Sequence, residues 1–119
     1  MSSERRISPR HPVDFSLQVS LDGSEQVFTA QANTLSRTSV EIGCHADLVT
    51  ALLQQPRLPQ FCFLEFSFGK SASQFLLDAQ VVTHRRLSQH QYALVLLFRH
   101  NDADQENLLD SLLDPVSPA

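Results

Sequence analysis

The sequence predicts a mainly β protein: a small six-stranded antiparallel barrel with a short helix after the third strand and a C-terminal helix. Three observations predict this fold class. Apolar and polar residues alternate over 13–21, Asp22-Gly23 follows as a strong hairpin signal, and strand patterns at 74–87 and 91–100 are separated by a short turn. Short strands joined by turns at this spacing are typical of a closed barrel covered by a helix.

The remaining elements follow from periodicity. Residues 26–33 complete the first hairpin, and residues 39–44 form a short third strand. Apolar residues at helical spacing over 45–55, followed by a proline, predict the middle helix. The aromatic-rich stretch 61–68 indicates a strand buried on nearly both faces. Leucines on one stripe over 102–113 predict the C-terminal helix.

The chain of 119 residues is short enough for a single domain. We expect a flexible N-terminal arm at 1–11, a barrel with its C-terminal helix at 12–114, and a disordered tail at 115–119. The arm lacks a hydrophobic period, whereas the rest of the chain carries one. An apolar content of 42% is ordinary for a globular protein and too high for a disordered one.

Charge and cysteine usage limit the environment of the protein. A formal net charge of −4 argues against broad electrostatic binding to nucleic acid or to an anionic membrane. No signal-peptide pattern follows Met1, and no apolar run approaches the roughly 18 residues of a membrane span. The two cysteines, Cys44 and Cys62, do not form a disulfide framework. The sequence therefore predicts a cytoplasmic protein with reduced thiols and no membrane insertion.

The stretch "RRISPRH" at 5–11 concentrates three arginines, Arg5, Arg6 and Arg10, in an acidic chain. One interpretation is a solvated terminus. The other is a local anion site, because the planar guanidinium donates paired hydrogen bonds to phosphate and to the O6 and N7 acceptors of guanine.

The spacing of these arginines ahead of the first strand resembles the R-x-x-x-R element of PilZ domains. These domains are bacterial six-stranded barrels, many of which bind cyclic di-GMP. Their second element, [D/N]-x-S-x-x-G, resembles "TLSRTS" at 34–39, where Ser36 matches the serine. Thr34 stands in place of Asp or Asn, and Ser39 in place of Gly, so the second motif is degenerate. The resemblance covers about residues 5–113.

The departures weaken the expected contacts. Thr34 offers one uncharged hydroxyl, whereas an Asp carboxylate accepts two hydrogen bonds from a guanine edge. Asn33, one residue earlier, is expected to face the other side of the strand because side chains alternate. Arg37 adds a candidate phosphate contact, although a solvent-facing loop charge is the plainer interpretation.

The resemblance implies a stand-alone PilZ protein that binds cyclic di-GMP and relays it to an unidentified protein partner. It implies no enzymatic activity, no cofactor and no metal. The alternative is a PilZ-like adaptor that has lost the nucleotide and acts by protein–protein contact. An oligonucleotide-binding barrel is disfavoured by the acidic charge and the single lysine. The expected ligand residues are Arg5, Arg6, Arg10, Thr34, Ser36, Arg37 and Ser39.

Other patterns point to structure rather than chemistry. Cys44 and His45 are neighbours whose side chains point apart on a strand, so they do not predict a nucleophile and base. The five histidines lack the spacing of metal ligands. His84-Arg85-Arg86 indicates a solvated segment near a hairpin turn, within reach of the arm if the barrel closes.

Overall fold

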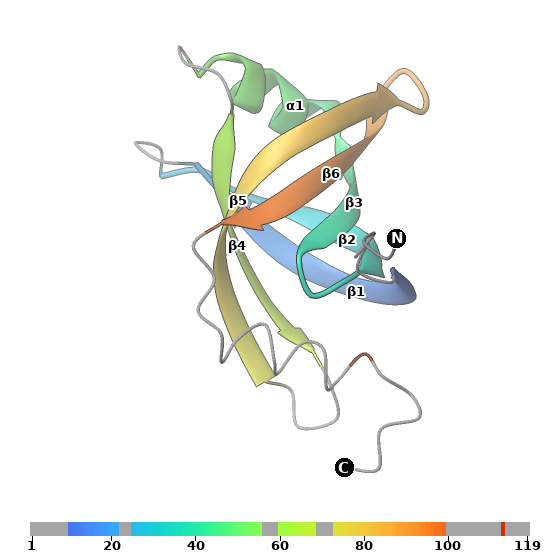
Figure 1. Cartoon of the computed structure of the whole chain (residues 1–119). Coiled ribbons are helices and arrows are strands. Elements are labelled where there is room, and N and C mark those ends of the chain that lie inside the picture. The colour runs from blue at the N-terminus through green and yellow to red at the C-terminus, as the bar shows by residue number, and fades with distance from the viewer. Residues whose placement is uncertain (1–9, 22–24, 56–59, 69–72, 100–112, 114–119) are drawn as a thin grey trace, which may run out of the picture.

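In the part of the chain that the structure describes, the fold is a closed barrel of six antiparallel strands with a helix after the third strand (Figure 1). The computed structural model describes residues 10–21, 25–55, 60–68, 73–99 and 113. Strand order around the barrel is β1-β2-β3-β6-β5-β4. The elements are β1 (His11–Ser20), β2 (Val27–Leu35), β3 (Ser39–His45), α1 (Ala46–Leu53), β4 (Phe61–Phe68), β5 (Ser73–Arg86) and β6 (Gln91–Arg99).

The mainly β class, the six strands and the helix after the third strand are confirmed. The Asp22-Gly23 turn lies outside the described residues, but β1 and β2 pair as the predicted hairpin. The C-terminal helix predicted over 102–113 also lies outside them, except for Leu113, which is helical and packs with the buried core. Within the described part of the chain, no helix is long and apolar enough to cross a membrane.

The joint between β1 and β4 closes the barrel over a short length. Three residue pairs form it, from Gln18 opposite Glu65 to Ser20 opposite Phe63. Below this joint, three rings stack inside the wall: Phe66 lies 5.2 Å from Phe15 and 5.2 Å from Phe75, centroid to centroid. The aromatic stack therefore fills the interior where backbone pairing between the two strands ends.

The core consists of the inward-facing residues of all six strands and one face of α1. The expectation that β4 is buried on nearly both faces is wrong. Its burial alternates, and Phe63, Glu65 and Ser67 are exposed, because the wall of an antiparallel barrel has one inner and one solvated face. The largest fully buried side chains are Phe75, Leu17, Leu35, Ile42, Leu48, Leu64, Leu94 and Leu96.

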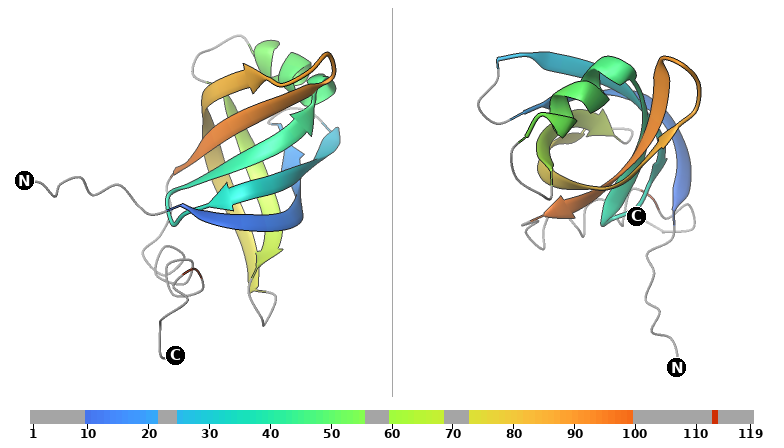
Figure 2. Two further views of the ribbon diagram at one scale, coloured as in Figure 1. Left: turned by 90° about the vertical axis from the view of Figure 1, so that its right-hand side faces the viewer. Right: turned by 90° about the horizontal axis from the view of Figure 1, so that it is seen from above.

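Helix α1 lies across one end of the barrel (Figure 2, right). Leu48, Val49 and Leu52 form its buried face, which contacts β3 and β6. His45 begins the helix: its Nδ1 accepts a hydrogen bond of 3.1 Å from the backbone N–H of Asp47. An imidazole nitrogen thus takes the capping role that Ser, Thr, Asp or Asn usually has.

We expect His45→Ala to lower the free energy of unfolding by about 0.5–2 kcal/mol, because it leaves a first-turn N–H without its acceptor. His45→Asn keeps a capping oxygen and should retain most of that stability. Urea unfolding at pH 7.5 measures both variants. Equal loss of stability in the two would contradict the capping role.

Candidate functional site

The turn between β2 and β3, residues 36–38, is organised by the hydroxyl of Ser36. Its Oγ accepts hydrogen bonds from the backbone N–H groups of Thr38 (3.2 Å) and Ser39 (3.0 Å). The backbone N–H of Ser36 donates a hydrogen bond of 2.9 Å to the carbonyl oxygen of Ser39. Ser36 is 1% exposed and is the single buried polar residue among those the structure describes. Its hydroxyl therefore holds the turn together from within.

The same turn is tied to the barrel wall. The carbonyl of Thr38 accepts a 2.8 Å hydrogen bond from the backbone of Phe98 in β6. The hydroxyls of Ser36 and Ser39 lie 3.0 Å apart. Ser39 is half-buried, whereas Arg37 is exposed. The turn thus has a fixed backbone that carries an exposed guanidinium at its tip.

Arg10 lies beside this turn. In the β1–β2 ladder, His11 pairs with Leu35, so Arg10, the residue before His11, is placed next to Ser36. Arg10 is exposed. The structure therefore brings Arg10 together with the 34–39 stretch. Arg5 and Arg6 lie outside the described residues.

A β-bulge changes which side chains of β2 face outward. Against β3, Ala32 pairs with Ile42 but Thr34 pairs with Glu41, so Asn33 is the extra residue. Ala32 and Leu35 are buried, while Asn33 is exposed and Thr34 half-buried. The expectation that Asn33 points away from the side of Thr34 is wrong, because the bulge interrupts the alternation and puts both on the outer face.

Gly43 of β3 provides the space into which the Asn33 side chain extends. A Cβ atom at Gly43 would lie 3.4 Å from the amide nitrogen of Asn33. That distance is the lower edge of ordinary van der Waals contact, so the Asn33 amide packs directly over Gly43. The close approach keeps the Asn33 amide next to β3, on the same face as Thr34.

Two charged residues from other strands share this outer face. Glu41, which pairs with Thr34 across the ladder, has a carboxylate oxygen 4.0 Å from the guanidinium of Arg85 in β5. Arg85 lies in β5, as the strand pattern over 74–87 predicted, and its side chain is exposed, although the His84–Arg86 segment is strand rather than loop. It pairs with Ala93 of β6, which in turn pairs with Gly43. Small residues therefore separate Arg85 from Asn33 along this row of the wall.

Sequence reasoning missed Glu41 and Asn33 as members of this face. The bulge that turns Asn33 outward does leave a mark in the hydrophobic pattern: Ala32 and Leu35 are both apolar and buried but lie three residues apart, where strict alternation requires an even spacing. For Glu41 a signal existed: a strand numbered by alternation from Val40 and Ile42 places Glu41 outside. The sequence did not show that Glu41 pairs with Thr34, because that pairing is set by the register of β2 and β3.

The cysteines and histidines do not form a reactive centre in the described part of the chain. Burial raises the pKa of the Cys44 thiol to about 11, and burial with the charge of Asp78 raises that of Cys62 to about 12. Both thiols are therefore protonated at neutral pH and poor nucleophiles. Within the same residues, no group of three His, Cys, Asp or Glu side chains gathers as a metal site. The neighbours Cys44 and His45 face opposite sides, as expected.

By sequence, the chain matches no known family model and no curated protein. Its fold is similar to that of solved structures. The inhibitor of motility MotI (DgrA) from Bacillus subtilis has a TM-score of 0.71 at 12% identity, over 92% of this chain and 49% of MotI. The PilZ domain of Escherichia coli YcgR with c-di-GMP has a TM-score of 0.68 at 15% identity, over 92% of this chain and 89% of that domain.

A third structure, PlzA from Borreliella burgdorferi in complex with c-di-GMP, has a TM-score of 0.66 at 14% identity, over 92% of this chain and 52% of PlzA. This chain thus spans about half the length of MotI and PlzA. These likenesses show that the chain has the fold of a PilZ domain, as the sequence motifs suggested.

We expect Ser36→Ala to lower the free energy of unfolding by about 1–3 kcal/mol, because it removes the acceptor from two backbone N–H groups in a buried turn. Ser16→Ala, the same substitution at an exposed position of β1, should change it by less than about 0.5 kcal/mol. Urea unfolding of both variants tests this difference. Indistinguishable midpoints would mean that the hydroxyl does not hold the turn.

Proposed function

We propose that this protein binds cyclic di-GMP at the outer face formed by the start of β1 and the β2–β3 turn, and relays the nucleotide signal to a protein partner. The protein acts as a receptor and adaptor, without an enzymatic step or cofactor. We assign it to the bacterial cytoplasm, in keeping with its two free, buried thiols. The fold shared with YcgR and PlzA, whose structures contain c-di-GMP, supports this proposal.

One observation carries the proposal for this chain: the β1–β2 register sets Arg10 beside the Ser36 turn. An exposed guanidinium next to a rigid turn is suited to a phosphate, because the turn needs no reorganisation on binding and only the Arg10 side chain has to be ordered. Arg37, at the tip of that turn, supplies a second cation. Arg5 and Arg6 precede Arg10 by a few residues and add phosphate or purine contacts when the ligand is bound.

The polar residues in and beside the turn have different roles in the proposed site. Ser36 fixes the backbone from inside, so it acts mainly by shaping the site. Thr34 and Ser39 offer hydroxyl groups at the rim. Asn33 supplies the carbonyl and amino groups that Thr34 lacks, because the bulge puts its amide on the same face. A side-chain amide accepts from and donates to the edge of a guanine.

We expect calorimetric titration to detect cyclic di-GMP binding by the full chain, more weakly than a complete motif would allow. Arg10→Ala should abolish measurable binding, because it removes a bidentate phosphate donor. The double variant Thr34→Asn with Ser39→Gly, which restores the family residues, should tighten binding about tenfold. Asn is preferred to Asp at position 34 because Glu41 lies directly opposite, and like charges there are destabilising.

Two results would contradict this receptor function. One is the absence of binding at millimolar nucleotide in both the wild type and the double variant, which would leave the ligand-free adaptor. The other is tight binding that Arg10→Ala leaves unchanged, which would make the arginine arm a solvated terminus.

The role of Asn33 has its own test. Asn33→Ala should weaken cyclic di-GMP binding by about tenfold, since it removes hydrogen bonds worth about 1–2 kcal/mol. Thr29→Ala, at an exposed position farther along β2, is the matched control and should bind like the wild type. If Asn33→Ala and Thr29→Ala have the same affinity as the wild type, Thr34 acts alone at this position.

A further inference from the structure

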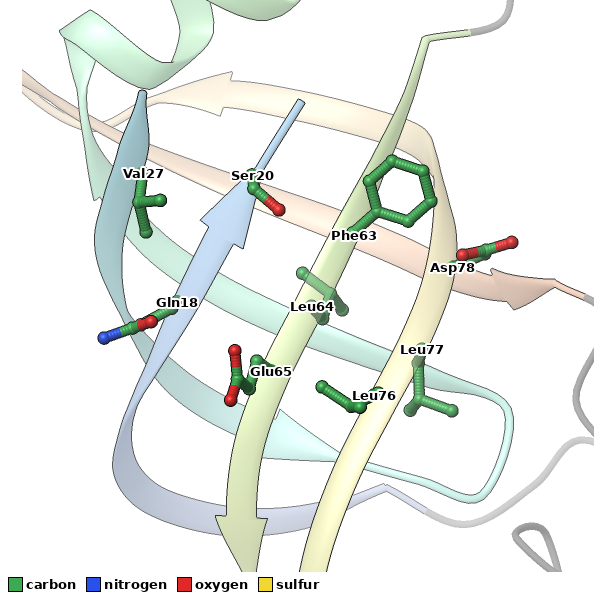
Figure 3. Close-up of a pocket in the computed structure, with 9 residues that line it drawn as sticks. All are labelled: Gln18, Ser20, Val27, Phe63, Leu64, Glu65, Leu76, Leu77 and Asp78. Atoms are coloured by element: carbon green, nitrogen blue, oxygen red, sulfur yellow. The ribbon is translucent and has the colours of Figure 1, made fainter. Parts of the chain in front are cut away.

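A cleft of about 300 Å³ lies on the outer face of the barrel where β1 meets β4, at the opposite end of β1 from Arg10 (Figure 3). Three exposed apolar side chains line it from three strands: Val27 of β2 is 55% exposed, Phe63 of β4 42% and Leu76 of β5 64%. Large exposed apolar side chains that gather around one cleft mark an interaction site more often than chance scatter does.

The strand register explains why the cleft forms. Ser20 pairs with Val27 on one side and with Phe63 on the other, so a short polar side chain separates two large apolar ones. Figure 3 shows Ser20 between Val27 and Phe63. The next outward row continues from Gln18 to Glu65 and Leu76. A depression between raised apolar walls follows directly from this order of small and large residues.

The charge at the cleft is negative. Glu65 and Asp78 line it, and the described lining residues include no Lys or Arg. The carboxylate of Glu65 accepts a hydrogen bond of 3.1 Å from the neutral amide of Gln74. Arg99 of β6 pairs in register with Asp78, and its guanidinium stacks on Phe61, 4.1 Å from the ring centre. An apolar cleft edged by carboxylates favours an apolar group with a cation beside it.

Three occupants from this protein are unsuitable. The basic arm carries two large apolar residues, Met1 and Ile7. Ile7 lies four positions before His11, a reach of about 14 Å, whereas β1 spans about 30 Å from His11 to the cleft, and Met1 is followed by Ser2, Ser3 and Glu4 rather than by a cation. The chain after Arg99 holds five acidic residues and no Lys or Arg. A symmetric second copy would set the Glu65 and Asp78 carboxylates against their own counterparts.

We propose that this cleft docks a segment of a partner protein that presents a large apolar side chain flanked by Lys or Arg. The inference deepens the proposed adaptor function, because it names the surface and the chemistry of the partner. The apolar side chain enters between Val27 and Phe63 and covers Leu76. The flanking cations lie against Glu65 and Asp78, where they also speed the encounter and fix its orientation.

Selection from a displayed random-peptide library on the full-length protein tests the proposal without assuming a partner. The enriched peptides should combine a large apolar residue with neighbouring Lys or Arg. Leu76→Lys should weaken the best of them by about tenfold or more, since it removes a central apolar contact. Leu87→Lys is the matched control: Leu87 is 55% exposed, lies outside the cleft and receives the same charge, so binding should be retained.

A second variant probes the charge. Glu65→Gln keeps the shape of the cleft and should weaken the enriched peptides about threefold, with a shallower dependence of affinity on salt. Folding of each variant is checked by urea unfolding, so that loss of binding is not loss of structure.

Several outcomes would overturn the proposal: no enriched peptide, enriched peptides that are acidic or uncharged, or equal loss in Leu76→Lys and Leu87→Lys. A dimer in sedimentation that Leu76→Lys dissociates, or binding to phosphatidylglycerol vesicles through this face, would also overturn it. Cyclic di-GMP titration of Leu76→Lys separates the two proposals. If Leu76→Lys binds cyclic di-GMP with wild-type affinity but no longer binds the peptides, both proposals are supported. If the wild type binds the peptides but not cyclic di-GMP, only the receptor function is contradicted.

Discussion

The closure of the sheet between β1 and β4 is the constraint on which the rest of the structure depends. Three residue pairs make this joint, and they turn a six-stranded sheet into a barrel with one inner and one outer face. Closure commits every second side chain to the interior, which explains the strict alternation along β3 and β4. It also leaves an outer face on which polar and apolar side chains are free to serve function.

The bulge at Asn33 shows how much of the candidate site depends on backbone irregularity. Binary alternation predicts the core of β2 well on either side of this residue, with Ala30, Ala32 and Leu35 buried. A single inserted residue then changes which polar groups lie together, and it brings Asn33 and Thr34 to the same face opposite Glu41. Bulges re-aim side chains next to binding sites in just this manner.

The sequence predicted the strands, the first hairpin and α1 because each depends on local periodicity, which neighbouring residues carry. Through motif spacing it also indicated that Arg10 and the 34–39 stretch form one ligand site; the register puts them side by side, and the ligand role stays a prediction. It did not predict the role of Ser36 as the internal acceptor of a turn, nor the Arg85–Glu41 contact. The Ser36 hydrogen bonds are local, but they depend on the backbone conformation of the turn, which the hydrophobic pattern does not carry. The Arg85–Glu41 contact depends on which strands become neighbours, since β6 pairs with both β3 and β5 and so brings them close.

The placement of charge explains how an acidic protein with arginines near its N-terminus has room for an anion site. Glu65 and Asp78 lie near the end of β1, and Arg10 lies before its start, so the two charged regions are separated by about 30 Å of strand. The Debye length at physiological salt is about 8 Å, so the carboxylates at one end barely repel an anion at the other. A net charge of −4 therefore does not oppose a local anion site. Because both regions lie on β1 and β2, one small barrel has room for a nucleotide at one end and a basic partner at the other, and the same two paired strands connect the two sites.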